Sequence, residues 1–139
     1  MENVKVNITT THKTDEGNLQ IKIECDGIYL KRDDYHYIKY EYIDEENGGC
    51  VKTMIKASDD LIEVHSKGDS NYHMIFEKNS VHPSVIQMQK MSIDAYVATK
   101  DLQIDVKKDK IGLSIDYELH VNGEVMTEAI MKIDMIKGK

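Results

Sequence analysis

The feature that most constrains this chain is an alternation of apolar and polar residues from position 111 to position 136, interrupted by Asn122-Gly123. Successive side chains of a β-strand point to opposite faces of its sheet, so each alternating run predicts a strand with one buried face. Asn-Gly between two such runs indicates a β-hairpin. The apolar positions are Ile111, Leu113, Ile115, Tyr117, Leu119 and Val121, then Val125, Ala129, Met131, Ile133 and Met135.

The same pattern predicts the register of this hairpin. A two-residue Asn122-Gly123 loop would pair odd-numbered with even-numbered residues and so place the two apolar sets on opposite faces. A three-residue loop over positions 121–123 keeps both sets on one face, with Gly123 as a G1 bulge. Ile115, Tyr117 and Leu119 should then point inward with Val125 and Met131, while Met126 and Ile130 point outward. The predicted pairs are Leu119 with Val125, Tyr117 with Thr127, Ile115 with Ala129, Leu113 with Met131, Ile111 with Ile133, His120 with Glu124 and Asp116 with Glu128.

Length and charge limit the classes of protein to consider. A chain of 139 residues, 40% of them apolar, is long enough for one domain with its own core. The net charge is −7, and Arg32 is the one arginine among 18 basic residues, so nucleic acid is not an expected partner. We find neither a signal peptide nor an apolar run of membrane-spanning length, and we therefore expect a cytoplasmic protein with Cys25 and Cys50 as reduced thiols.

Shorter alternating runs fill the rest of the chain. Runs at 4–8, 19–25, 28–32, 35–43, 50–56, 61–66, 72–78 and 102–106 predict strands, and the polar stretch 9–17 predicts a loop. The segment 82–100 fits either a helix opened by Pro83 or two strands. Many short strands joined by tight turns predict an antiparallel barrel or sandwich.

Several fragments, in this order and spacing, resemble the YwiB-like proteins, which are small bacterial proteins of unknown function found mostly in Firmicutes. The resemblance extends from about Val4 to Ile136. It implies an all-β fold: a single antiparallel calycin-type, lipocalin-like barrel of about 8–10 strands with little or no helix, which favours two strands in 82–100. It implies no established ligand or activity. The fragments are Tyr37-Ile38-Lys39-Tyr40-Glu41-Tyr42, Thr53-Met54-Ile55-Lys56, Gly68 followed by Met74-Ile75-Phe76, Thr99 followed by Leu102, and Gly112-Leu113 followed by Ile115, Tyr117 and Leu119.

Two positions depart from the family pattern. Ser66 stands where these proteins usually have an arginine, and Met91 stands where they usually have a glycine. A role that depends on that arginine is therefore not carried over to this chain.

The interior of such a barrel is the first candidate site. A barrel of about eight strands can hold one small ligand, and methionine-rich linings adapt to varied shapes. We expect a small, largely apolar ligand to contact Tyr40, Tyr42, Met74, Phe76, Tyr117, Leu119 and Met131. Alternatively, these side chains fill the barrel, and the protein binds a partner or forms a homodimer through Met126, Ile130 and Ile136 on its outer face. We find no catalytic motif, and we expect neither a cofactor nor a membrane partner.

A second candidate is a pair of histidines. If Ser66 pairs with Tyr72, His65 faces His73 on the outer side of the hairpin, and Glu63 lies two residues along the same face. Two imidazoles and a carboxylate are zinc ligands, although two solvated histidines on an outer face are the alternative. Cys50 follows the acidic pair Glu45-Glu46, which disfavours an activated thiolate.

Overall fold

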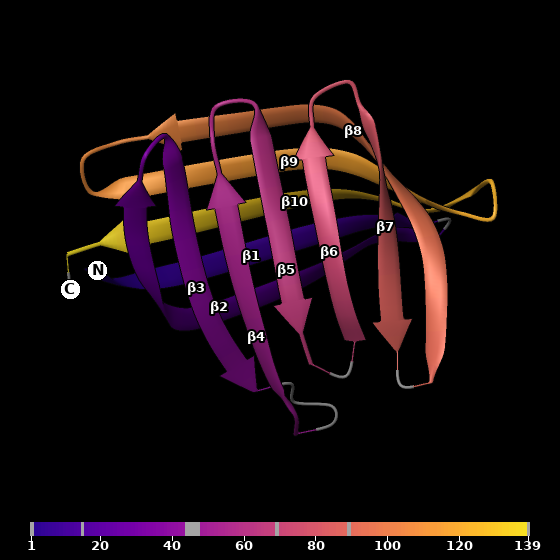
Figure 1. Ribbon diagram of the computed structural model, residues 1–139, viewed down its shortest axis with the longest axis horizontal. Helices are drawn as coiled ribbons and strands as arrows, with labels where there is room; N and C mark the ends of the chain where they lie inside the picture. The colour runs from indigo at the N-terminus through magenta and orange to yellow at the C-terminus, as the bar shows by residue number, and fades with distance from the viewer. Residues whose placement is uncertain (1, 15, 44–47, 69, 89, 139) are drawn as a thin grey trace.

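The computed structural model describes residues 2–14, 16–43, 48–68, 70–88 and 90–138, and it consists of ten strands in one closed antiparallel barrel (Figure 1). Each strand pairs with its neighbours in sequence, and β1 pairs with β10 to close the barrel. The described residues contain no helix, so the predicted all-β barrel is confirmed. The strands are β1 (Glu2–Thr14), β2 (Gly17–Arg32), β3 (Tyr35–Ile43), β4 (Cys50–Ala57), β5 (Leu61–Lys67), β6 (Ser70–Glu77), β7 (Val81–Met88), β8 (Met91–Val106), β9 (Lys110–Val121) and β10 (Glu124–Lys137).

The barrel is flattened into two layers whose strands cross at a steep angle. Figure 1 shows β3 to β7 in front, while β8, β9, β10, β1 and β2 run behind them in a different direction. This arrangement resembles an orthogonal packing of two sheets, in which the inward side chains of both layers form the core.

The β5–β6 hairpin has the predicted register. Ile62 pairs with Phe76, Val64 with Met74, and Ser66 with Tyr72. One face of the hairpin is therefore apolar and lies in the core, and its other face carries His65 opposite His73.

The predicted register of the β9–β10 hairpin is wrong. The loop is a two-residue turn in which Asn122 has φ 55° and Gly123 has φ 80°, as a type I′ turn requires. A β-bulge then lies between Val125 and Thr127, where Met126 is an extra residue. The bulge restores the alignment of the apolar faces. The observed pairs are Leu119 with Thr127, Tyr117 with Ala129, Ile115 with Met131, Leu113 with Ile133, Ile111 with Met135, His120 with Val125, Asp116 with Ile130 and Glu118 with Glu128.

Most residues of this hairpin that were predicted to point inward or outward do so despite the different register. Ile115, Tyr117 and Leu119 are buried, and Met126 is exposed. Val125 was predicted to point inward, but it is exposed and lies opposite His120 because it precedes the bulge.

Three further expectations about the strands need correction. The stretch 9–17 is not a loop, because β1 continues to Thr14, paired with both β2 and β10. The runs 19–25 and 28–32 form one strand, β2. The run 102–106 is not a separate strand but belongs to β8, which continues through a bulge between Thr99 and Asp101. The segment 82–100 lies in the two strands β7 and β8, as the family resemblance implied.

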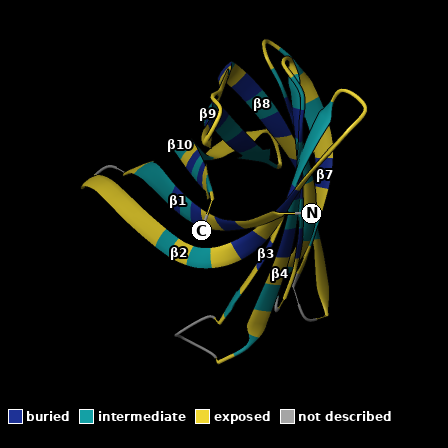
Figure 2. Cartoon of the chain, turned by 90° about the vertical axis from the view of Figure 1, so that its left-hand side faces the viewer, coloured by how far each residue is buried: buried dark blue, intermediate teal, exposed yellow. Residues whose placement is uncertain are grey.

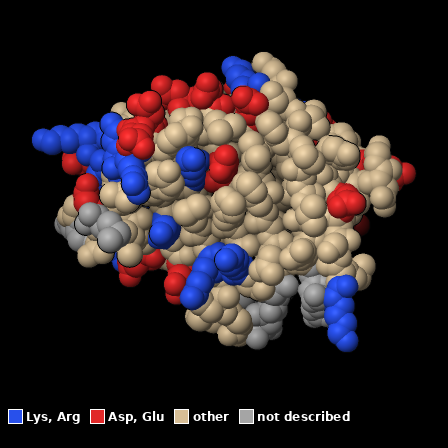
Figure 3. All heavy atoms as spheres, in the orientation of Figure 1, with Lys and Arg blue, Asp and Glu red and all other residues tan. Residues whose placement is uncertain are grey.

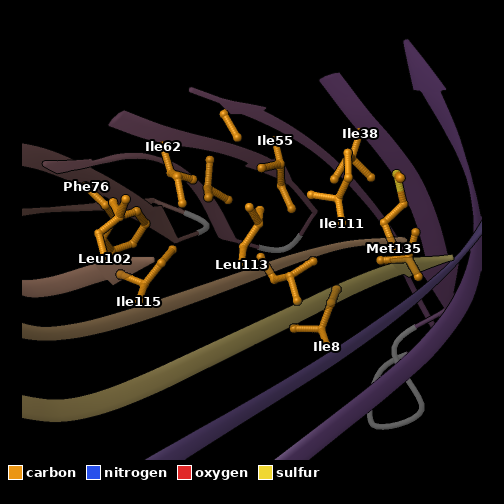
Figure 4. Close-up of a cluster of buried hydrophobic side chains, with 14 of the residues drawn as sticks. Ile8, Ile38, Ile55, Ile62, Phe76, Leu102, Ile111, Leu113, Ile115 and Met135 are labelled. Atoms are coloured by element: carbon orange, nitrogen blue, oxygen red, sulfur yellow. The ribbon is translucent and has the colours of Figure 1, made fainter. Parts of the chain in front are cut away.

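The core lies between the two layers. Its fully buried side chains come from both layers, and Figure 4 shows several of them pointing toward one another. Burying one such aliphatic or aromatic side chain contributes about 1.5–3 kcal/mol. The largest of them are Phe76, Ile38, Ile55, Ile62, Ile111, Ile115, Ile133 and Met135.

Strand β2 pairs with β3 over only part of its length in the described residues. Its described pairs with β1 cover residues 17–29, whereas its described pairs with β3 cover residues 27–32. At Gly27 the layers approach closely: an added Cβ would lie 2.8 Å from the Lys39 carbonyl oxygen and 2.8 Å from Val6 Cγ2. Among the described pairs, residues 18–26 thus pair with β1 and not with β3.

The described residues include no helix with the length and apolar character needed to cross a membrane.

Candidate functional site

One row of paired residues shows that the inner face of the barrel continues beyond the packed core. Leu19 on β2 is opposite His12, His12 is opposite Ala129, and Ala129 is opposite Tyr117. Paired residues share a face of the sheet. Ala129 and Tyr117 are buried in the core, so Leu19 lies on the inner face, although it is 56% exposed.

The next row repeats the pattern. Ile21 is opposite Thr10, Thr10 is opposite Met131, and Met131 is opposite Ile115. Ile115 is fully buried, whereas Ile21 is 46% exposed. Residues 18–26 of β2 thus include apolar side chains that point inward and still contact solvent, and Figure 2 shows much of this part of the strand as exposed. We call Leu19 and Ile21 the inner lip.

The predicted ligand-binding residues all lie on the inner face. Phe76 and Tyr117 pack edge to face with ring centroids 5.0 Å apart, and Tyr40 stacks with Tyr42 at 6.3 Å. Ligand contact by these residues stays a prediction. Of the seven, Tyr40, Phe76, Tyr117 and Leu119 are buried, and Tyr42, Met74 and Met131 are partly buried against the core.

Hydroxyl groups form a polar row across the inner face of the front layer. Tyr40, Thr53, Ser66 and Tyr72 are successive partners on β3 to β6, and the hydroxyl oxygens of Thr53 and Ser66 lie 3.2 Å apart. Burial raises the pKa of Tyr40 and of Tyr72 above the ordinary value, and it raises the pKa of Tyr117 to about 12. These phenols are therefore neutral hydrogen-bonding groups at physiological pH.

Thr99 adds a buried hydroxyl to the same face of the barrel. It pairs with Tyr117, and its Oγ1 is buried without a hydrogen-bond partner among the described residues. A buried polar atom of this kind is uncommon and calls for an explanation. Thr53, Ser66 and Thr99 were not among the residues predicted from the sequence to contact a ligand; their place in the alternation was the available signal.

A groove of about 700 Å³ lies on the outside of the barrel. Outward side chains of β3, β4 and β5 form its floor, and residues of β1 and β2 form its wall. Figure 3 shows basic and acidic side chains interspersed on this side of the molecule. The lining residues are Asn3, Asp26, Gly27, Ile28, Lys39, Tyr40, Glu41, Lys52, Thr53, Met54, His65 and Lys67.

The predicted histidine pair is formed at one side of this groove. His65 and His73 face each other, and their rings stack with centroids 3.8 Å apart and an angle of 15° between the planes. His73 Nε2 lies 3.8 Å from Glu63 Oε2. Burial, followed by the nearby His73, lowers the pKa of His65. The three side chains thus bring two imidazoles and a carboxylate together on the outer face.

The predicted carboxylate pair is not formed. Asp116 lies opposite Ile130, and Glu128 lies opposite Glu118, because the bulge shifts the register. Lys100 Nζ is 3.9 Å from a Glu118 oxygen and 4.0 Å from a Glu128 oxygen, which places a cation between the two carboxylates.

Cys50 is exposed, and its Sγ lies 3.9 Å from Glu41 Oε2. The other cysteine, Cys25, is partly buried and packs against the core.

The outward apolar residues of β10 are spread along the strand. Met126 and Ile136 are exposed, whereas Ile130 is partly buried. At a rise of about 3.4 Å per residue, Met126 and Ile130 lie roughly 13 Å apart. Ile136 pairs with Lys5 and with Lys110, so charged side chains flank it. The three residues therefore do not form one continuous patch.

Three comparisons with known proteins agree with one another. A family model described as a domain of unknown function (DUF1934) matches residues 6–133. The uncharacterized β-barrel protein YwiB of Bacillus subtilis (strain 168) is 30% identical over 114 residues, and the match covers 79% of this chain and 77% of that protein. The crystal structure of the B. subtilis ywiB protein superposes with a TM-score of 0.86 at 21% identity, covering 99% of this chain and 93% of that one.

Proposed function

The chain belongs to the family defined by the domain of unknown function DUF1934, and from this premise we propose that it is a non-enzymatic binding module for a small, largely apolar ligand. The ligand would lie against the inner face of the barrel, between the inner lip and the tyrosines of the front layer. The observation that carries this proposal is the exposure of Leu19 and Ile21 on the face that elsewhere forms the core.

Apolar surface that faces inward but remains exposed to solvent is available to a ligand without loss of packing within the protein. A ligand that covers it removes apolar area from water, at about 25 cal/mol per Å². Binding sites for small molecules are usually lined by apolar and aromatic side chains with a few polar groups that fix the orientation. The inner face offers this combination, because the hydroxyls of Tyr72, Tyr117 and Thr99 lie among apolar side chains.

Binding of N-phenyl-1-naphthylamine, a neutral apolar fluorophore, tests this proposal. The wild-type protein should enhance its fluorescence with saturation at one site. Ile21→Asp should weaken binding by about tenfold or more, because a charge replaces an apolar contact of roughly 1.5 kcal/mol or more.

Leu30→Asp is the matched control. Leu30 lies on the same strand with similar exposure, 40% against 46%, but it is opposite Tyr37 on the outer face. This variant should bind the fluorophore as the wild type does. Equal loss in both variants, or undiminished binding by Ile21→Asp, would refute binding at the inner lip.

Native mass spectrometry of freshly purified protein separates this function from the alternative of a homodimerising barrel. The proposal predicts a fraction of monomer with a small-molecule mass retained. Dimer without added mass would instead favour association through an outer face.

We also propose a cytoplasmic location, which the free thiols of Cys25 and Cys50 support.

A further inference from the structure

We propose that Glu63, His65 and His73 form a binding site for one zinc ion on the outer face of the β5–β6 hairpin. The candidate ligand atoms, one from each residue, all lie within 4.8 Å of one another. The site is independent of the inner face, since cross-strand partners His65 and His73 point away from the side on which Phe76 is buried.

The backbone already places the ligands correctly. Zinc binds imidazole nitrogen at about 2.0–2.1 Å and carboxylate oxygen at about 2.0–2.2 Å, so bound ligand atoms lie roughly 3–3.5 Å apart. In the stacked arrangement the two rings are 3.8 Å apart, and His73 Nε2 is 3.8 Å from Glu63 Oε2. Zinc binding would require the side chains to rotate so that one nitrogen of each ring is directed at a common point.

One of the three candidate ligands carries a charge that favours a cation. The rings of His65 and His73 stack closely, and a carboxylate oxygen of Glu63 lies within reach of both. A neutral imidazole is the form that binds a metal. Glu63 is partly buried beside both rings and supplies a negative charge.

Three protein ligands leave a fourth position for water or an exchangeable anion. His65 belongs both to this cluster and to the lining of the outer groove, which also carries Lys39, Lys52 and Lys67. Lys52 is 4.0 Å from Glu41, while the described residues provide no ion-pair partner for Lys39 or Lys67. A small anion bound to the zinc would therefore lie near cationic side chains.

The chain provides its own control pair. His82 Nε2 lies 3.0 Å from Glu77 Oε1, so this pair has an imidazole and a carboxylate in contact. The described residues place no second histidine or cysteine with it as a third ligand. If zinc affinity requires the three-residue cluster, removing His82 should leave it unchanged.

Isothermal titration of the full chain with zinc chloride, after removal of metal by a chelator, tests the proposal. The wild type should bind one equivalent, and the His65→Ala/His73→Ala variant should bind at least about 100-fold more weakly. His82→Ala should match the wild type. Cobalt(II) gives a second readout, because the visible absorption of a four-coordinate ion should appear with the wild type and with His82→Ala but not with the double variant.

Circular dichroism first checks that the double variant is folded, as we expect for substitutions on the outer face. If the double variant does not fold, His73→Ala, which removes the more exposed ring, replaces it in the titration. The proposal is overturned if the wild type gives no saturable heat with zinc. It is equally overturned if the folded variant retains wild-type affinity, or if His82→Ala alone abolishes binding.

Discussion

Replacing Phe76 with Ala should lower the free energy of unfolding by about 3–5 kcal/mol. Phe76 is the only phenylalanine of the chain and is fully buried, and its ring packs edge to face on Tyr117 across the two layers. The substitution removes the burial of an aromatic ring and leaves a cavity that the stiff strands of both layers cannot close. The loss is a large part of the 5–15 kcal/mol by which domains of this size are stable.

Urea unfolding followed by circular dichroism measures this loss, and Tyr96→Ala is the control. Tyr96 is also aromatic, but it is exposed and paired with Pro83 and His120 on the outside of the barrel. Its removal should cost less than about 1 kcal/mol. Equal losses in the two variants would mean that the interface between the layers is not the principal core.

Local patterns made much of the fold predictable. The β5–β6 hairpin follows from its sequence because one register places Val64 and Ile62 opposite Met74 and Phe76. The same local register brought His65 and His73 together, so this candidate site was found before the structure.

The β9–β10 hairpin shows the limit of such patterns. The alternation requires that odd-numbered residues pair with odd-numbered residues, but several registers satisfy this. We assumed that the turn would supply the extra residue. The positive φ angles of Asn122 and Gly123 instead fit the two-residue type I′ turn, whose twist matches that of the strands. The extra residue moves to Met126, beyond the turn.

Longer-range effects were not predictable from local sequence. The polar stretch 9–14 is strand because it pairs on both sides, with β2 and with β10. The exposure of Leu19 and Ile21 depends on where β3 ceases to pair with β2, and the outer groove is lined from β1 to β5. Each of these features depends on contacts between strands that come together only in the closed barrel.

Two single-residue deletions in β10 should differ greatly in their effect. Deleting Met126 removes the bulge and leaves a regular hairpin, in which Tyr117 still faces Ala129 and Leu113 still faces Ile133. Met126 is 63% exposed, so little burial is lost with it. The free energy of unfolding should change by less than about 1 kcal/mol.

Deleting Lys132 also removes an exposed side chain, but Lys132 has inward-facing residues on both sides of it along the strand. No single register then keeps both Ala129 and Ile133 inward, since a shift by one residue exchanges the faces. If Ile133 and Met135 turn outward, the loss is at least about 3 kcal/mol from the burial of those two side chains alone.

The central claim is that the alternation of β10, realigned by the bulge at Met126, divides its side chains between the core and the outer surface. Urea unfolding of the wild type and of the two deletion variants, followed by circular dichroism, tests it most directly. We predict that the variant lacking Met126 unfolds near the wild-type midpoint, whereas the variant lacking Lys132 loses at least about 3 kcal/mol or fails to fold. Equal destabilisation by the two deletions, or wild-type stability without Lys132, would contradict the claim.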